Sequence, residues 1–174
     1  SSMKINKIED IPEYDIKSKI ETIKTVSPGK VQELSHMRKA ISNHMMKSIN
    51  TSAHVHLMTE IDVTEIVNFV KANQNSFYEK ENFNLTYTPF ILMSTIKALK
   101  SHPLVNASLI NDSIHYHKHI NIGLAVSIED GLMVPTIFNC EEKNFLGLCR
   151  SVNEIANRAR SNEITPDELG GSTF

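Results

Sequence analysis

The sequence predicts an α/β protein of the layered α+β kind, in which a mixed sheet is flanked by helices. Two observations carry this prediction. Apolar residues recur at helical spacing in several separate segments. Between about residues 105 and 138, short apolar runs are separated by turn signals, which is typical of strands. Because the two kinds of segment lack a regular βαβ alternation, a mixed-sheet fold is favoured over a doubly wound one.

The first two predicted elements are a helix and a strand. The helix has one apolar face at spacings of three and four, made by Leu34, Met37, Ile41, Met45 and Ile49. From Ala53 to Asp62 the pattern alternates instead, with one face made by Val55, Leu57, Thr59 and Ile61. This alternation predicts a half-buried strand.

Three further helices and a group of strands are predicted after residue 63. The helices run from Thr64 to about Asn73, from Thr88-Pro89 to a point before Pro103, and from about Asn144 to Arg160. The strands lie at about 105–109, 113–117, 119–128 and 132–138, with a hairpin turn at Glu129-Asp130-Gly131. A capped short turn opens at Thr165-Pro166-Asp167-Glu168.

Composition limits the class of function. The 18 Lys+Arg residues nearly balance the 20 Asp+Glu residues, so no basic footprint for nucleic acid is expected. No segment approaches the roughly 20 apolar residues that span a bilayer, so no membrane partner is expected. Two cysteines are too few for a disulfide framework, and Cys149, among apolar neighbours on a helix, is expected to be a buried thiol.

Histidines form one pattern that could suggest a metal. His115, His117 and His119 alternate along a predicted strand, and imidazole is a ligand for zinc, copper or nickel. Alternate residues of one strand stand roughly 7 Å apart, so three in a row seldom close on one ion. We therefore expect a solvent-facing stripe and no metal site, and the same holds for the pair His54 and His56.

Five stretches in order carry a resemblance to a known family. They are Met37-Arg38-Lys39-Ala40-Ile41 with Met45; Thr51-Ser52-Ala53-His54-Val55 leading to Glu60-Ile61-Asp62-Val63-Thr64; Leu85-Thr86-Tyr87-Thr88-Pro89-Phe90 through Asn106-Ala107-Ser108; Asn121-Ile122-Gly123-Leu124-Ala125-Val126 with Asp130-Gly131-Leu132-Met133-Val134-Pro135; and Ala156-Asn157-Arg158-Ala159-Arg160 with Thr165-Pro166-Asp167-Glu168-Leu169 and Gly170-Gly171-Ser172-Thr173-Phe174. Over about 36–174 the chain resembles the catalytic domain of dihydrolipoamide acyltransferases of the 2-oxo acid dehydrogenase complexes. Alanine at position 53 departs from the family's usual proline.

The resemblance implies a chloramphenicol acetyltransferase-like fold and transfer of an acyl group between a dihydrolipoyl thiol and coenzyme A. Such chemistry needs a base for the thiol and donors for the tetrahedral oxyanion. In the family these are the histidine of an H-x-x-x-D-G motif and a serine or threonine, and both would lie beyond Phe174. The resemblance therefore implies a domain incomplete at its C-terminus, so that this segment by itself is expected to be inactive. Residues 1–30 would be a tag remnant and linker or peripheral arm, and residues 31–174 the N-terminal portion of the catalytic domain.

Several residues receive roles by resemblance. Arg38 matches the arginine that pairs with the aspartate of H-x-x-x-D-G, a supporting role, and without that partner it should be exposed or paired elsewhere. His54 matches a position near the substrate channel and should shape its wall rather than act as the base. Asp130, Gly131 and Leu132 match the strand bordering the acyl and pantetheine channel, although an ordinary hairpin turn explains them nearly as well.

The resemblance also implies substrates, partners and location. Coenzyme A and a lipoyl group, carried on a lysine outside this chain, would be the substrates, and no metal is implied. Partners would be two further copies in a homotrimer, a larger symmetric core, the lipoyl domain, and the decarboxylase and dihydrolipoamide dehydrogenase components. The location would be the bacterial cytoplasm, or the mitochondrial matrix in a eukaryote. A non-catalytic assembly module remains the alternative function.

Overall fold

The structure is a computed structural model that describes residue 29, residues 33–129 and residues 131–174. The chain forms two compact units, Ser1–Met58 and Thr59–Phe174. Apart from Gly29, the linker expected over residues 1–30 lies outside the described residues. No helix in the described ranges is long and apolar enough to cross a membrane.

The first unit contains helix α2, His36–Thr51, which confirms the first predicted helix. Ser35 caps it in an extended conformation, and the Arg38 N–H donates to the Ser35 hydroxyl over 3.4 Å. Side chains of the predicted apolar face are exposed, including Ile41, Met45 and Ile49. The helix is therefore present, but its apolar face is not covered within this unit.

The predicted strand over residues 53–62 is wrong for this structure. The segment forms neither helix nor strand, and Val55 and Leu57 are 85% and 97% exposed. A strand requires a neighbour that accepts and donates its backbone hydrogen bonds. Among the described residues, no hydrogen bond joins the backbone of this segment to the backbone of another segment. The alternating pattern identified a face that can be buried, but it did not supply the neighbouring strand.

Three helices dominate the second unit: α3, Thr64–Glu81; α4, Thr88–Ser101; and α5, Phe145–Arg160. Their starts agree with the prediction. Helix α3 continues well past the expected end near Asn73 and stops at Asn82, which adopts the left-handed conformation with φ 61°. Phe77, on this additional part, packs edge-on against Phe83, and this packing gives the longer helix a partner that local periodicity did not reveal.

The strands are short and form three antiparallel pairs rather than the one mixed sheet that was expected. Strands β1 (Ala107–Ile110) and β2 (Ser113–Tyr116) pair, as do β3 (Ile122–Gly123) and β6 (Thr136–Ile137), and β4 (Val126–Ile128) and β5 (Gly131–Met133). Two predicted long strands are thus each divided in two. Pro135 lacks an N–H and interrupts the ladder, while its carbonyl accepts from the Leu124 N–H at 2.8 Å.

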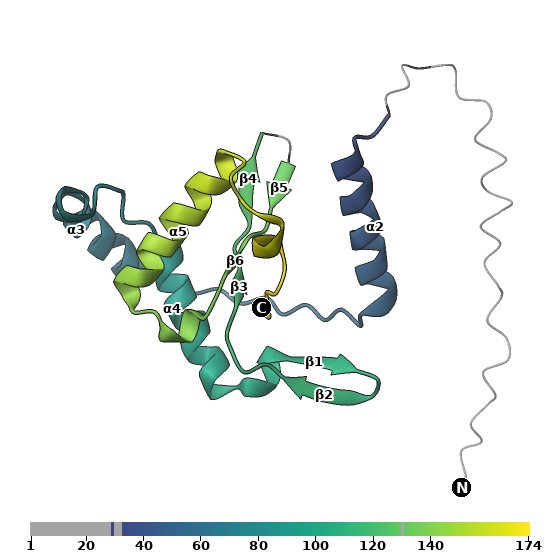
Figure 1. The fold of residues 1–174 in the computed structure, drawn as a ribbon. Helices are drawn as coiled ribbons and strands as arrows, with labels where there is room; N and C mark the ends of the chain where they lie inside the picture. Colours follow the sequence, from purple (N-terminus) through teal and green to yellow (C-terminus); the bar gives the residue numbers. More distant parts are fainter. Residues whose placement is uncertain (1–28, 30–32, 130) are drawn as a thin grey trace, which may run out of the picture. The chain divides into compact units, whose positions relative to one another are not determined.

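The core of the second unit lies between α4, α5 and the β3–β6 pair (Figure 1). Its buried members are Leu92, Ile96, Leu99, Ile120, Ile122, Ile137, Cys140, Leu148 and Ile155. A smaller cluster joins α3 to the start of α5 through Val70, Leu85 and Cys149. These two clusters pack against the short strands and hold them in place. A functional site can therefore form at the edges and loops beside β3 and β4.

Three short 3₁₀ helices connect the larger elements. They are η2 (Pro103–Asn106), η3 (Cys140–Glu142) and η4 (Pro166–Leu169). In η4 the Thr165 N–H donates to the Glu168 carboxylate, which completes the capping box that the sequence predicted.

Candidate functional site

The residues predicted for the site are divided between the two units. Arg38 lies on α2 and is exposed. His54 is also exposed, and its Nε2 stands 3.5 Å from the Ser48 hydroxyl. Both residues belong to the first unit, whereas Gly131 and Leu132 belong to the second.

The hairpin at Gly131 confirms the predicted turn. Gly131 pairs with Ile128 at the start of β5, and Leu132 pairs with Ser127 and is 55% exposed. The φ of Gly131 is 149°, a conformation that other residues rarely adopt, although a Cβ would meet no atom within 4 Å. Glycine is thus required here by the backbone and not by lack of space. The third predicted residue of this group, Asp130, lies outside the described residues.

The segment Gly170–Phe174 lies along β3, and Asn121 holds it there. The Thr173 N–H donates to the Asn121 carbonyl at 2.7 Å, and the Gly123 N–H donates to the Phe174 carbonyl at 2.8 Å. The Asn121 side chain donates to the Gly171 carbonyl and accepts from the Asn139 N–H, both at 3.0 Å. This single asparagine therefore joins the approach to β3, the end of β6 and the Gly-Gly segment.

Close packing confirms that this segment is seated tightly. A Cβ on Gly123 would stand 3.0 Å from the Val134 side chain and 3.5 Å from Ser172. Gly171 has φ 78°, and a Cβ there would meet the Phe138 ring at 3.2 Å. At each glycine a neighbouring side chain packs closely against the backbone, in space that a Cβ would need. The sequence contained both glycines within recognised motifs, but nothing in their spacing showed that the two motifs meet.

An ion pair anchors the same segment from its other end. The Arg158 guanidinium on α5 binds the Glu168 carboxylate of η4 through two nitrogens, at 2.5 and 2.7 Å. Hydrogen bonds from Arg158, and further ones from Thr165, lower the pKa of Glu168 to about 2. Residues 170–174 thus follow an anchored turn and are held along β3 by backbone hydrogen bonds.

A cavity of about 270 Å³ opens between α4, α5 and β4. Polar groups at its walls include Thr86, Ser127 and Asn153, and Cys149 lies at its lining while only 2% exposed. Burial raises the pKa of the Cys149 thiol to about 11, so the thiol stays protonated at neutral pH. This result confirms the prediction of a buried thiol and excludes Cys149 as an activated nucleophile.

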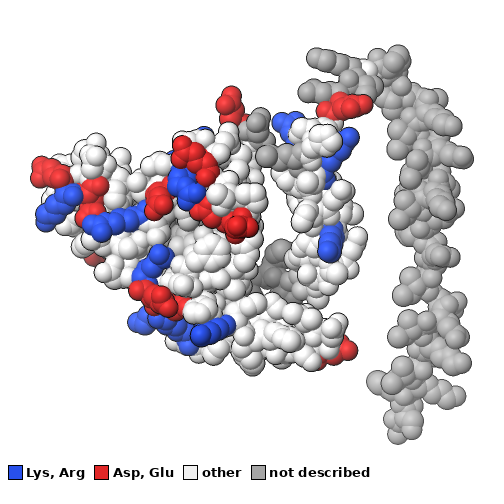
Figure 2. All heavy atoms as spheres, viewed as in Figure 1, with Lys and Arg blue, Asp and Glu red and all other residues white. Residues whose placement is uncertain are grey.

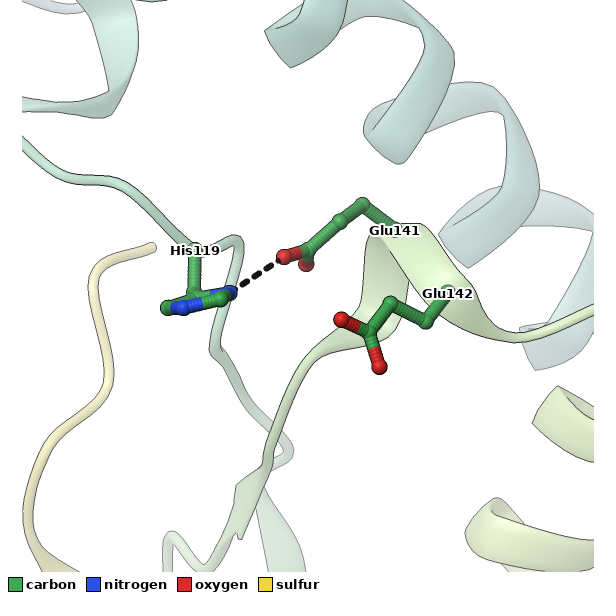
Figure 3. Close-up of side chains that lie close together, drawn as sticks. All are labelled: His119, Glu141 and Glu142. Atoms are coloured by element: carbon green, nitrogen blue, oxygen red, sulfur yellow. Dashed lines mark hydrogen bonds and ion pairs between the residues drawn. The ribbon is translucent and has the colours of Figure 1, made fainter.

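A second group of chemically active side chains contains His119, Glu141 and Glu142 (Figure 3). His119 Nδ1 lies 2.7 Å from Glu141 Oε1, and the Ile120 N–H donates to Glu141 Oε2 at 2.9 Å. Burial acts to raise the pKa of Glu141, but hydrogen bonds from Ile120, its own N–H and His119 outweigh it, so the pKa is lowered.

The expected histidine stripe is therefore only partly correct. His115 on β2 is exposed, and His117, just after β2, pairs its Nε2 with the Ser108 hydroxyl at 2.9 Å. His119 lies beyond the strand and points toward Glu141 instead. Alternate side chains share one face only within a strand. Strand β2 ends at Tyr116, so the alternation does not extend to His119.

Charges of both signs are interspersed on the face of the second unit shown in Figure 2. The second unit also contains two salt bridges: Arg150 with Glu81 at 2.8 Å, and Arg158 with Glu168. The first joins α5 to the end of α3, and the second joins α5 to η4.

Solved structures share this fold. A probable dihydrolipoamide acetyltransferase from Listeria monocytogenes is 35% identical with a TM-score of 0.80, and the match covers 84% of this chain and 62% of that one. The cubic core of a pyruvate dehydrogenase multienzyme complex matches at 28% identity with a TM-score of 0.78, covering 95% and 65%. The fold is thus that of acyltransferase catalytic cores, as the resemblance to chloramphenicol acetyltransferase-like proteins predicted.

Sequence relatives identify the family. The pattern of the 2-oxoacid dehydrogenases acyltransferase (catalytic domain) family matches residues 27–174. A lipoamide acyltransferase component of the branched-chain alpha-keto acid dehydrogenase complex from Bacillus subtilis is 37% identical over 138 residues, which are 79% of this chain and 32% of the relative. A dihydrolipoyllysine-residue acetyltransferase component of the pyruvate dehydrogenase complex from Mycobacterium bovis is 38% identical over 148 residues, 84% of this chain and 27% of the relative.

The chain belongs to the 2-oxoacid dehydrogenase acyltransferase family, in its catalytic domain. It spans about a third or less of the length of these two curated relatives.

Proposed function

We propose that the protein containing this chain transfers an acyl group between dihydrolipoamide and coenzyme A. The observation that carries the proposal is the seating of Gly170–Phe174 along β3, with both ends of the segment anchored. In the family this segment leads to the hydroxyl that stabilises the oxyanion. A preorganised oxyanion donor is worth several kcal/mol of barrier, roughly 3–4 in measured cases, and therefore needs a rigid approach.

The predicted residues keep supporting roles in this proposal. Arg38 would bind the aspartate of H-x-x-x-D-G and orient the histidine base. A planar guanidinium suits a bidentate contact with a carboxylate. His54 would form part of the channel wall, and Gly131 and Leu132, with Asp130, would border the acyl and pantetheine channel. The exposure of Arg38, His54 and Leu132 supports these roles because each side chain is free to meet a second surface.

The substrates and partners follow from the family. Coenzyme A and a lipoyl group are the proposed substrates, and the lipoyl domain, the decarboxylase and the dihydrolipoamide dehydrogenase are the proposed partners. The two curated relatives described above are named for different complexes, one for branched-chain and one for pyruvate substrates. Their bacterial sources favour the bacterial cytoplasm over the mitochondrial matrix.

The test is an acyl-transfer assay on the full-length gene product. Acetyl-coenzyme A and dihydrolipoamide are supplied, and release of coenzyme A is followed, with branched-chain and succinyl donors compared. Arg38→Lys retains the charge but removes the bidentate fork, so we expect a large loss of kcat with little change in KM. Lys39→Arg, on the same exposed helix, is the matched control and should retain activity. No transfer with any acyl donor would contradict the proposal.

The alternative is a non-catalytic assembly module, and exposed apolar side chains favour a role in assembly. Leu57 and Met58 are 97% and 100% exposed in the segment that forms no strand. Family members build trimers and larger cores, and the solved cubic core is one of the structures that this fold matches. Light scattering distinguishes the cases: an oligomer without acyl transfer supports the module, and a monomer at high concentration contradicts it.

A further inference from the structure

We propose that His119, Glu141 and Glu142 form a binding site for a divalent first-row transition metal ion of the zinc class. One potential ligand atom from each residue lies within 4.8 Å of the other two. In Figure 3 the imidazole and both carboxylates face the same gap, and they come from two segments more than 20 residues apart: the loop after β2 and helix η3. None of these three residues was given a role in acyl transfer above.

The donor set suits such an ion. Zinc binds histidine nitrogen and carboxylate oxygen at about 2.0–2.2 Å, and a site with three protein ligands leaves a position for water. Imidazole selects zinc, copper, iron or nickel over magnesium and calcium, which prefer oxygen alone. One imidazole with two carboxylates is therefore a transition-metal set rather than a site for a hard cation.

Two of the three ligands are held on rigid backbone. The His119 carbonyl accepts from the Asn106 amide at 3.1 Å, and Asn106 is only 4% exposed. Glu141 is fixed by the Ile120 N–H, and it follows Cys140, whose thiol is fully buried and donates to the Ile137 carbonyl at 3.1 Å. Glu142 is exposed and can turn toward the ion. A site built on anchored elements loses little entropy on binding.

Binding requires a small rearrangement. His119 Nδ1 and Glu141 Oε1 stand 2.7 Å apart, in direct contact. Two ligands at tetrahedral angles around zinc stand about 3.4 Å apart, given bonds of about 2.1 Å. The two atoms therefore need to move apart by less than an ångström to bind the same ion.

A lysine opposes the metal only weakly. The Lys100 ammonium donates to the Glu141 backbone carbonyl at 2.9 Å and not to either carboxylate. Its charge disfavours a cation nearby, but it does not occupy a ligand atom. Both carboxylates therefore remain available as ligands.

The test is a titration of the purified protein with Co²⁺, followed by visible absorption, and with Zn²⁺, followed by calorimetry. We expect one equivalent of metal to bind, with the absorption of a low-coordinate Co²⁺ site. His119→Gln and Glu142→Gln should each weaken binding by more than the roughly 10–100-fold that loss of a supporting contact produces. Glu142→Gln alters an exposed side chain and should fold normally, which circular dichroism checks.

Matched controls separate this site from the other histidines and carboxylates. His115→Gln removes an exposed histidine on β2, and Glu163→Gln removes an exposed carboxylate beyond α5. Both should bind as the parent does. Equal weakening by the controls, or unchanged binding in both His119→Gln and Glu142→Gln, would overturn the proposal. None of these measurements depends on acyl transfer, so the outcome is independent of the proposed function.

Discussion

Helices α2 and α5 have the same length, 16 residues, and were predicted from the same apolar spacing, yet they differ in what their apolar faces contact. In α5, Leu148 and Ala159 are fully buried against the rest of the second unit. In α2, Met45 and Ile49 are about 60% exposed. The comparison shows that periodicity identifies a face that can be buried, while the surface that covers it is decided by other segments or other molecules.

Removing a core side chain from α5 should have the largest effect. Leu148→Ala deletes a side chain with 0% exposure and should lower the free energy of unfolding by roughly 2–5 kcal/mol, because transfer and cavity costs add. The matched change on the other helix, Ile49→Ala, should cost about 0.5 kcal/mol or less. Urea unfolding measures both. Equal losses would show that the α2 face is buried in solution and would break the comparison.

The ion pair that fixes α5 to η4 should make stability depend on pH. Glu168 has a pKa of about 2 in the folded protein and an ordinary value of 4.5. Because the folded pKa is the lower one, the stabilisation is present above about pH 4.5 and is lost as the pH falls toward 2. Glu168→Gln should therefore lower stability at pH 7 and approach the parent near pH 2. Glu163→Gln is the control, and a deficit that does not vary with pH would contradict this explanation.

Helix caps should produce a smaller difference. Asn144 accepts from the Gly147 N–H at 2.8 Å, so Asn144→Ala should destabilise by about 1 kcal/mol. Ser35 accepts from the Arg38 N–H at 3.4 Å, which is long for a hydrogen bond, so Ser35→Ala should cost less. Thermal unfolding of the two variants measures how much stability each cap contributes. A greater loss from Ser35→Ala would mean that α2 contributes to the cooperative unit more than its exposure indicates.

The smallest effect on unfolding is expected for a charge on the exposed face. Met45→Glu places a carboxylate on a side chain that is 61% exposed, so it should leave the stability of a single chain nearly unchanged. If a second copy covers this face, the same change should abolish association, because an unpaired charge would be buried. Urea unfolding measures the stability of the single chain, and light scattering measures association. Lys47→Glu serves as the control for both.

The candidate site was predicted less completely than the helices. The turn at Gly131 was predicted because the sequence Glu-Asp-Gly is by itself a local signal for a hairpin turn. The meeting of Asn121 with Gly171 and Thr173 was not, because about 50 residues separate the partners and each interaction is a hydrogen bond without a sequence period. His119 was assigned to a strand that ends at Tyr116, so its pairing with Glu141 was also missed.

By itself the sequence determined where α3, α4 and α5 begin, the capped turn at Thr165, the buried character of Cys149 and membership of an acyltransferase family. Each of these depends on local spacing or on motifs in order. Only the tertiary structure decided that the expected sheet consists of three antiparallel pairs and that residues 53–62 form no strand. It also decided which distant side chains meet around β3 and η3. The physical reason is that a ladder, a bidentate pair or a ligand cluster requires two partners, and a local pattern describes only one of them.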